Sequence, residues 1–275
     1  MTASWSKRLA CLVAAVTCSN TYTLAGGLDE TISDGLILRQ KLLDNKTLTY
    51  VRVSLDRFDV RVITPLAPFV DSKQALGNVS NNPERISRGF FLRDYLRRYN
   101  ASAIISGGYI DSYSPPTSLG FVKSNSVTTS TPHASWLVDA LFCSDVGRAS
   151  VQLTTPTFDR PDFRDCLQAG PILLLNGTPP IDAPSVRGSG YAKFARLSVE
   201  RTFACLDAAG RVLMGVTEKI DLPTVVGALR SPEIGCVNAI GLTGSDTSGL
   251  LVKTRVFGND TYLFPNVLAV LPRSR

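Results

Sequence analysis

Alternating apolar and polar positions predict β-strands along much of the chain. Residues 50–55 and 58–63 alternate on either side of a short polar turn, a pattern typical of a β-hairpin. Residues 196–206 and 211–216 flank an Ala-Gly turn and predict a second antiparallel pair.

Two segments have helical rather than strand periodicity. Residues 83–100 place aromatic and aliphatic side chains at helical spacing, and residues 223–230 fit a short helix that begins with proline. The apolar run at residues 236–242 follows and predicts a buried strand. Because strands and helices do not alternate regularly, the expected fold class is α+β: a mixed, mostly antiparallel sheet packed with a few helices.

Composition fits one globular domain behind an export signal. The chain has 275 residues, 44% apolar and 19% charged, enough to build a core, with no linker or repeat that divides it. Residues 1–25 have two basic residues, an apolar stretch and a small-residue site compatible with cleavage before Gly26. The alternative, a buried first helix, is disfavoured by the polar run at residues 17–23. We therefore expect a domain at residues 26–275 that is secreted or periplasmic, with no transmembrane segment in the mature chain.

Cysteine spacing favours disulfides over a metal site. Four cysteines remain after cleavage, and in an oxidising compartment we expect Cys143 to pair with Cys166 and Cys205 with Cys236. A zinc site is the competing interpretation, and it lacks both a Cys-x-x-Cys pair and a second histidine. No metal ligands are predicted, and the cofactor is left unknown.

Charge disfavours a nucleic-acid partner. Cleavage would remove two of the 29 basic residues and none of the 23 acidic ones, which lowers the net charge from +6 to +4. Five arginines lie in residues 83–100, where they are interleaved with core positions instead of forming a dense basic face. They fit a solvated helix face that can also favour an anionic envelope polymer.

The residues after the 236–242 strand are rich in glycine and hydroxyl groups. Residues 243–249 read Thr-Gly-Ser-Asp-Thr-Ser-Gly, and backbone N–H groups and hydroxyls around one acid suit a phosphate or a sugar. On its own, such a run is more often an ordinary turn.

Three further segments in the same order change this interpretation. Residues 103–111 read Ala-Ile-Ile-Ser-Gly-Gly-Tyr-Ile-Asp, residues 168–177 read Gln-Ala-Gly-Pro-Ile-Leu-Leu-Leu-Asn-Gly, and residues 201–207 read Arg-Thr-Phe-Ala-Cys-Leu-Asp. Together with residues 236–249 these segments resemble the motifs of the phosphodiester glycosidase family, across roughly residues 48–270. The resemblance implies hydrolysis of a sugar-phosphodiester link in a glycan or glycolipid.

The resemblance also implies where the chemistry lies. Such a reaction needs donors on the phosphate and a carboxylate that activates water or stabilises an oxocarbenium-like transition state. Arg201 matches the Arg-Thr motif and is the expected phosphate ligand, since a guanidinium pairs bidentately with phosphate. A structural salt bridge is the alternative role on residue type alone.

The chain departs from the family pattern at three positions. Thr243 stands where the family has aspartate, Gly241 where it has asparagine, and Ser106 replaces another asparagine. The carboxylate candidates are therefore Asp246 in the same loop, Glu218 at a strand end and Asp111 after the Ser-Gly-Gly turn.

The expected catalytic residues are Asp246, Glu218 and Arg201. The expected substrate-binding residues are Ser106, Gly107, Gly108, Asp111, Thr202, Thr243, Gly244, Ser245, Thr247 and Ser248. His133 is given no role, and a Ser-His-Asp hydrolase is disfavoured because the chain has no Gly-x-Ser-x-Gly elbow. The alternative to a hydrolase is a binding protein that keeps the fold and the anion-binding loop without the catalytic acid.

Overall fold

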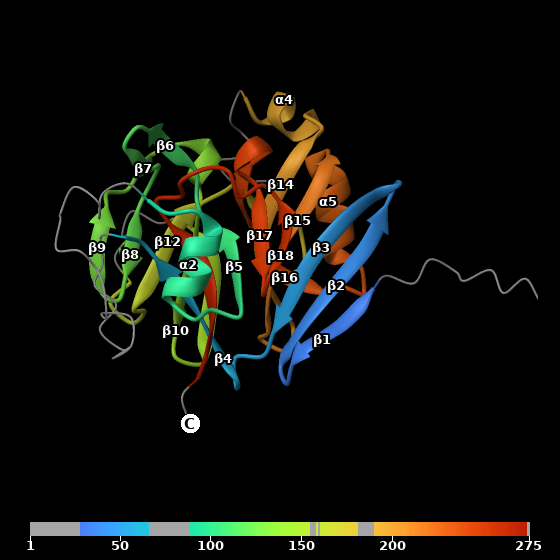
Figure 1. The fold of residues 1–275 in the computed structure, drawn as a ribbon. Coiled ribbons are helices and arrows are strands. Elements are labelled where there is room, and N and C mark those ends of the chain that lie inside the picture. Colours follow the sequence, from blue (N-terminus) through green and yellow to red (C-terminus); the bar gives the residue numbers. More distant parts are fainter. Residues whose placement is uncertain (1–27, 66–88, 155–157, 159, 181–189, 274–275) are drawn as a thin grey trace, which may run out of the picture.

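The computed structural model describes residues 28–65, 89–154, 158, 160–180 and 190–273. The predicted signal segment and the first part of the predicted helix at residues 83–100 lie outside these residues. Within them the fold is rich in strands, and the strands pair antiparallel in three larger sheets and one small one (Figure 1). The expected sheet-rich, mostly antiparallel character is confirmed, with the strands divided among several sheets instead of one.

The largest sheet has seven strands. Their order is β1 (Asp29–Ser33), β2 (Leu36–Leu43), β3 (Lys46–Val53), β15 (Val212–Ile220), β14 (Val199–Asp207), β16 (Cys236–Gly244) and β13 (Ile172–Leu174).

The other strands form two five-stranded sheets and a small ribbon. One sheet has the order β11 (Arg148–Leu153), β10 (Ala140–Asp145), β12 (Asp165–Ala169), β8 (Val122–Ser124) and β9 (Val127–Ser130). The other has the order β18 (Arg255–Gly258), β17 (Gly249–Val252), β5 (Ala103–Ser106), β19 (Val267–Pro272) and β4 (Phe58–Ile63). The ribbon consists of β6 (Ile110–Tyr113) and β7 (Pro116–Ser118).

Apolar side chains fill both faces of the seven-stranded sheet. One face packs into a core shared by all three large sheets, with Val51, Phe142 and Leu250 among its members. The opposite face packs Phe203 against Val225 in a second core that includes α5 (Leu222–Arg230) and α4 (Tyr191–Arg196). A third core lies under α2 (Leu92–Arg98), which covers the sheet that contains β5 (Figure 1). The central strands of the large sheet are therefore largely buried on both sides.

Several local predictions are confirmed. β14 and β15 pair antiparallel, and β16 is the buried strand expected at residues 236–242. The helix predicted at residues 223–230 is α5, which has Pro223 in its first turn and is capped by the Asp221 carboxylate accepting from Thr224 N at 2.8 Å. Both predicted disulfides are present: Cys143–Cys166 joins paired strands β10 and β12, and Cys205–Cys236 joins β14 and β16.

The predicted hairpin between residues 50–55 and 58–63 is wrong. Both segments are strands, but β3 pairs with β2 and β15, while β4 pairs with β19 near the end of the chain. A turn in which Phe58 N donates to Ser54 O carries the chain from one sheet to the next. Alternation shows that a strand has two different faces, and it does not identify the neighbour along either edge.

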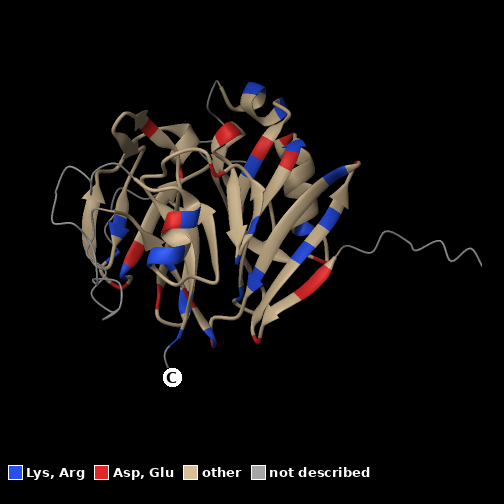
Figure 2. Cartoon of the chain, viewed as in Figure 1, with Lys and Arg blue, Asp and Glu red and all other residues tan. Residues whose placement is uncertain are grey.

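Charged residues of both signs are interspersed over the described part of the chain (Figure 2). Three predicted basic residues lie on α2, where Arg93 pairs with Asp260 at 2.7 Å and Arg98 stacks over Phe90. Among the described residues, no helix combines the length and hydropathy that crossing a bilayer would demand.

Candidate functional site

The four segments that resemble family motifs meet at one small recess, which we call the motif cavity. It lies on the face of the seven-stranded sheet that carries α4 and α5, whose Phe194, Leu222 and Val225 close it. The motif residues that line it are Tyr109, Gly170, Pro171, Leu173, Arg201, Thr202, Phe203, Gly241, Leu242 and Thr243. Segments more than 100 residues apart in the chain are thus brought to one point, as the resemblance implies.

Arg201 lies at the centre of this meeting point and is 4% exposed. Its Nη2 donates to Phe194 O at 3.0 Å and to Leu197 O at 2.9 Å, and its Nε donates to Ile220 O at 3.4 Å. The guanidinium also lies 4.7 Å from the centre of the Phe194 ring. Among the described residues, backbone carbonyls therefore accept the hydrogen bonds of this buried cation.

Burial lowers the pKa of Arg201, while Tyr109, Asp221 and Tyr191 act in the opposite direction. Burial also raises the pKa of Tyr109, against the effect of the Arg201 charge. Tyr191 shows the same pattern. Of these groups, Tyr109 and Arg201 line the cavity, and a phenol and a guanidinium are both hydrogen-bond donors.

Threonine hydroxyls order the loop beside Arg201. Thr202 Oγ1 donates to Thr243 O at 2.8 Å and accepts from Thr243 N at 3.1 Å. Thr243 Oγ1 lies 2.6 Å from Thr247 Oγ1, which donates to Gly244 O at 2.8 Å. The threonine that replaces the family aspartate is therefore held in an internal network and supplies no carboxylate.

The departure at Gly241 has a steric cause. Gly241 N donates to Pro171 O at 2.9 Å, and a Cβ at this position would lie 2.8 Å from Gly170 O. In this chain a side chain at Gly241 would require the Gly-Pro segment to shift, so glycine fits the observed packing.

The Ser-Gly-Gly turn is fixed by a residue that the sequence interpretation missed, Asn266. Its Oδ1 accepts from Gly108 N at 2.8 Å, and a Cβ on Gly107 would lie 1.8 Å from that oxygen. Ser106 is fully buried, and its Oγ accepts from Gly249 N at 3.2 Å. These groups hold the wall of the motif cavity. Ser248 is also buried, and among the described residues its Oγ has no hydrogen-bond partner.

The three candidate carboxylates lie in different places. Asp246 is exposed on a short 3-10 turn, η2 (Ser245–Thr247), just past Gly244, which pairs with Arg201 across the sheet. The pKa of Tyr113 on β6 is raised by burial first, then by the charges of Tyr262 and Asp246. Asp111 is exposed on β6.

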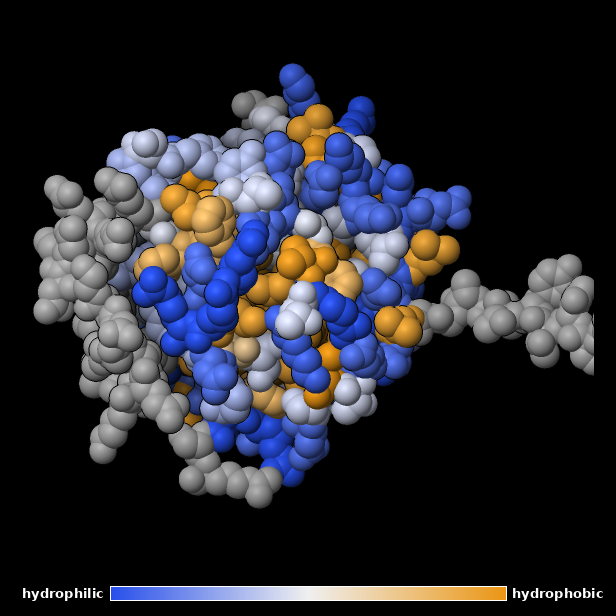
Figure 3. Space-filling model, in the orientation of Figure 1, coloured by the Kyte–Doolittle hydropathy of each residue, from blue (hydrophilic) through white to orange (hydrophobic). Residues whose placement is uncertain are grey.

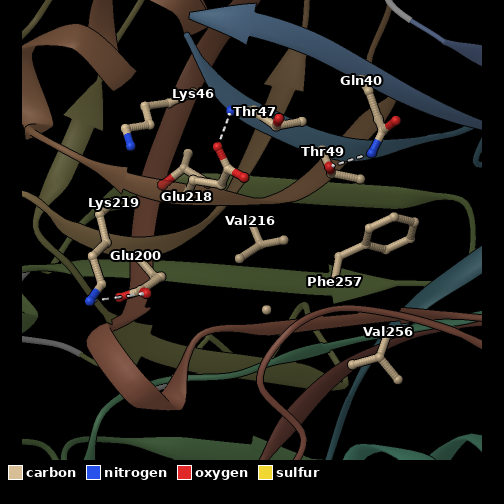
Figure 4. A pocket seen from close by; sticks show the side chains of 12 residues that line it. Gln40, Lys46, Thr47, Thr49, Glu200, Val216, Glu218, Lys219, Val256 and Phe257 are labelled. Carbon is tan, nitrogen blue, oxygen red and sulfur yellow. Dashed lines mark hydrogen bonds and ion pairs between the residues drawn. The ribbon is translucent and has the colours of Figure 1, made fainter. Parts of the chain in front are cut away.

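Glu218 lies on the opposite face of the sheet from the Arg201 guanidinium. Its Oε2 accepts from Thr47 N at 2.8 Å (Figure 4). The structure therefore does not bring Glu218 together with Arg201. It places Glu218 in a separate hollow of about 530 Å³ beside β18, which we call the β18 hollow.

Asp139 is a buried carboxylate that the sequence interpretation did not select. It is 2% exposed, and its Oδ1 accepts from Ile172 N at 2.8 Å, just after the Gly170–Pro171 wall. Its charge raises the pKa of Tyr109 and Tyr191, after burial. No sequence signal separated Asp139 from the other acidic residues. Among the described residues, no group of three or more His, Cys, Asp or Glu side chains is arranged to hold a metal ion.

A comparison with models of protein families shows to which family the chain belongs. The family model for phosphodiester glycosidases matches residues 99–271, which is more than half of the sequence. The chain belongs to the phosphodiester glycosidase family. Its departures at Gly241, Thr243 and Ser106 make it a divergent member. Among curated proteins, none matches the chain significantly.

Solved structures share the fold at low identity. A hypothetical protein from Synechocystis superposes with a TM-score of 0.68 at 12% identity, over 91% of this chain and 64% of that chain. The catalytic domain of zebrafish N-acetylglucosamine-1-phosphodiester alpha-N-acetylglucosaminidase, auto-inhibited by its pro-peptide, gives 0.64 at 15% identity, over 90% of this chain and 82% of that chain. A putative exported protein from Burkholderia pseudomallei gives 0.58 at 12% identity, over 82% and 74%.

Proposed function

We propose that this protein is a hydrolase that releases a sugar from a phosphodiester-linked glycan or glycolipid at the motif cavity. The observation that carries the proposal is the convergence of the four family segments on Arg201, a buried guanidinium that stands beside two phenols. Family membership supplies the reaction class.

The reaction breaks the bond between the anomeric carbon and the phosphodiester oxygen. Water adds to the carbon, its proton goes to a base, and the departing oxygen keeps the bonding electrons as part of a phosphomonoester. Arg201 stabilises the negative charge on that phosphate. Asp246 is the proposed base, because its loop occupies the place of the family's glycine-rich motif and Thr243 carries no carboxylate.

The cavity as it stands is closed. Its free volume is about 10 Å³, close to the space that one water molecule occupies and far below that of a sugar. Phe194 O and Leu197 O occupy the Arg201 donor Nη2. Substrate binding therefore requires α4 to move away, so that phosphate oxygens replace these carbonyls as acceptors.

An extracytoplasmic location is part of the proposal. The two disulfides and the exported protein among the structural neighbours support it. A surface glycan or glycolipid is then an accessible substrate.

The test is an assay with N-acetylglucosaminyl and glucosyl p-nitrophenyl phosphodiesters. Glycosidic cleavage produces p-nitrophenyl phosphate, so colour should appear only after a phosphatase is added. Direct nitrophenol release would indicate a phosphodiesterase instead. In ¹⁸O-water the label should enter the sugar hydroxyl and not the phosphate.

Two variants locate the carboxylate. Asp246→Asn should lower turnover by roughly a hundredfold or more if Asp246 is the base, whereas Asp29→Asn, on an outer strand, should not. Thr243→Asp should add little activity if Asp246 already acts as the base. It should restore hydrolysis if the chain lacks only the carboxylate that the family pattern has at position 243. If neither the wild type nor the Thr243→Asp variant hydrolyses any of these substrates, the proposed hydrolase activity is contradicted and a binding role remains.

A further inference from the structure

The β18 hollow lies on the face of the seven-stranded sheet opposite the motif cavity. Side chains from β2, β3, β14, β15 and β18 line it, and its volume is about 530 Å³. Small-ligand sites in proteins usually enclose about 300–1,000 Å³. The hollow is therefore large enough for a sugar, unlike the motif cavity in its closed form.

The two ends of the hollow differ in chemistry. Glu200, Glu218, Lys46 and Lys219 lie toward one end, and the ring of Phe257 lies toward the other (Figure 4). Figure 3 shows apolar surface near the middle of this face with hydrophilic side chains around it.

The charged groups retain hydrogen-bonding capacity. Among the described residues, Glu218 accepts from Thr47 N, although an ionised carboxylate can accept about four hydrogen bonds. Glu200 has a loose ion pair with Lys219 at 3.9 Å, and Lys219 is 67% exposed. Exposed pairs of this kind are weak, so a ligand can replace them readily.

We propose that the β18 hollow binds a neutral saccharide. Two carboxylates and two ammonium groups balance, so the hollow favours neither an anion nor a cation. Hydroxyl groups of a sugar donate to the carboxylates and accept from the ammonium groups. The C–H face of the sugar ring packs on Phe257, which combines a flat apolar surface with few rotatable bonds. This site holds a glycan without acting on it.

The test is an NMR titration of ¹⁵N-labelled protein with N-acetylglucosamine, glucose and their trimers. Amide signals of β15 and β18 should shift with roughly millimolar affinity, since a shallow site orders few groups. Phe257→Leu and Glu218→Gln should each weaken binding at least fivefold. Tyr113→Ala and Glu233→Gln, which change an exposed aromatic and an exposed glutamate elsewhere, should not.

The outcomes are separable from those of the hydrolysis assay, because the titration needs no turnover. Shifts confined to residues 107–109 and 241–247 would overturn the proposal and assign saccharide binding to the motif cavity alone. Absence of any shift at 50 mM saccharide, a concentration about fifty times the expected dissociation constant, would overturn it too. Unchanged amide spectra of the free variants show that a loss of binding is not a loss of fold.

Discussion

The motif cavity and the β18 hollow lie on opposite faces of one sheet and are organised differently. In the motif cavity a buried cation is surrounded by backbone carbonyls, an aromatic ring and threonine hydroxyls that bond to one another. In the β18 hollow Glu218 and Lys219 are exposed, and the ion pair between Glu200 and Lys219 is loose at 3.9 Å. Groups in the first region support the fold as well as any reaction, whereas those in the second are available to a ligand at little cost in stability.

The largest expected effect concerns the disulfide between the two strands that line the motif cavity. Cys205–Cys236 ties β14 to β16, the strands that carry Arg201 and Thr243. Replacing both cysteines by alanine should lower the free energy of unfolding by about 3–4 kcal/mol, because the closed loop spans 31 residues.

Urea denaturation with an oxidised wild type as reference measures this loss. The matched control is the reduced wild type, which should be destabilised at least as much, since both disulfides are then open. An unchanged midpoint in the double variant would show that strand packing alone holds these two strands together.

The next effect concerns Gln168, at the start of the wall that contains Gly170. Its Oε1 accepts from Phe121 N at 2.8 Å and His133 N at 3.0 Å, and its Nε2 donates to His133 O and Val138 O, both at 2.7 Å. Gln168→Ala should cost about 3 kcal/mol, because it leaves the buried Phe121 N and Val138 O and two partly buried groups of His133 without their partner.

Thermal denaturation measures that loss. The control is Gln152→Ala, because Gln152 lies on β11 at the edge of the same sheet and accepts one part-buried hydrogen bond, from Arg160. Gln168→Glu provides a second comparison, because it keeps the acceptor and removes the two donors. Equal stability of Gln168→Ala and the control would show that water satisfies the backbone groups instead.

The sequence predicted much of the structure around β14, β15, α5 and β16 because the local signals there are strong. The turn between β14 and β15, the proline at the start of α5 and the apolar run of β16 each indicate one element. The cysteine pairs were predicted because oxidised cysteines leave few combinations.

The face on which Glu218 lies and the pairing of β3 depended on long-range register, which alternation does not encode. Arg201 lies opposite Thr217, so Glu218 points to the other face, and this became visible only once the pairing was known. The missed pairing of β3 with β15 has the same cause. Nothing in residues 191–197 indicated that α4 would cover Arg201, because that contact uses backbone carbonyls, which every residue has.

A smaller effect concerns the shape of two cations, Arg201 and Arg255. Arg201→Lys keeps the charge but loses the planar fork that reaches Phe194 O, Leu197 O and Ile220 O. We expect a loss of about 2 kcal/mol in stability. Arg255→Lys, on β18, should cost less than about 0.5 kcal/mol, because the Arg255–Glu30 pair is exposed.

Urea titrations of both variants give the comparison directly. Equal losses would remove the distinction between a cation that the fold requires and one that it does not. If Arg201→Lys keeps full stability and loses only hydrolysis, the carbonyl contacts contribute little and Arg201 serves the phosphate alone.

The smallest effect is expected in the β18 hollow itself. Glu218→Gln preserves an oxygen that can accept from Thr47 N, and Glu218→Ala removes it at an exposed position where water takes its place. Both variants should therefore unfold within about 0.5 kcal/mol of the wild type. Thr202→Val, on the same sheet in the motif cavity, breaks the buried link to Thr243 and should cost about 1–2 kcal/mol. A loss in Glu218→Ala as large as that in Thr202→Val would show that the hollow's carboxylate supports the fold. A small loss of stability in Glu218→Ala, accompanied by weaker saccharide binding, would show that one face of the sheet contributes to stability and the other to recognition.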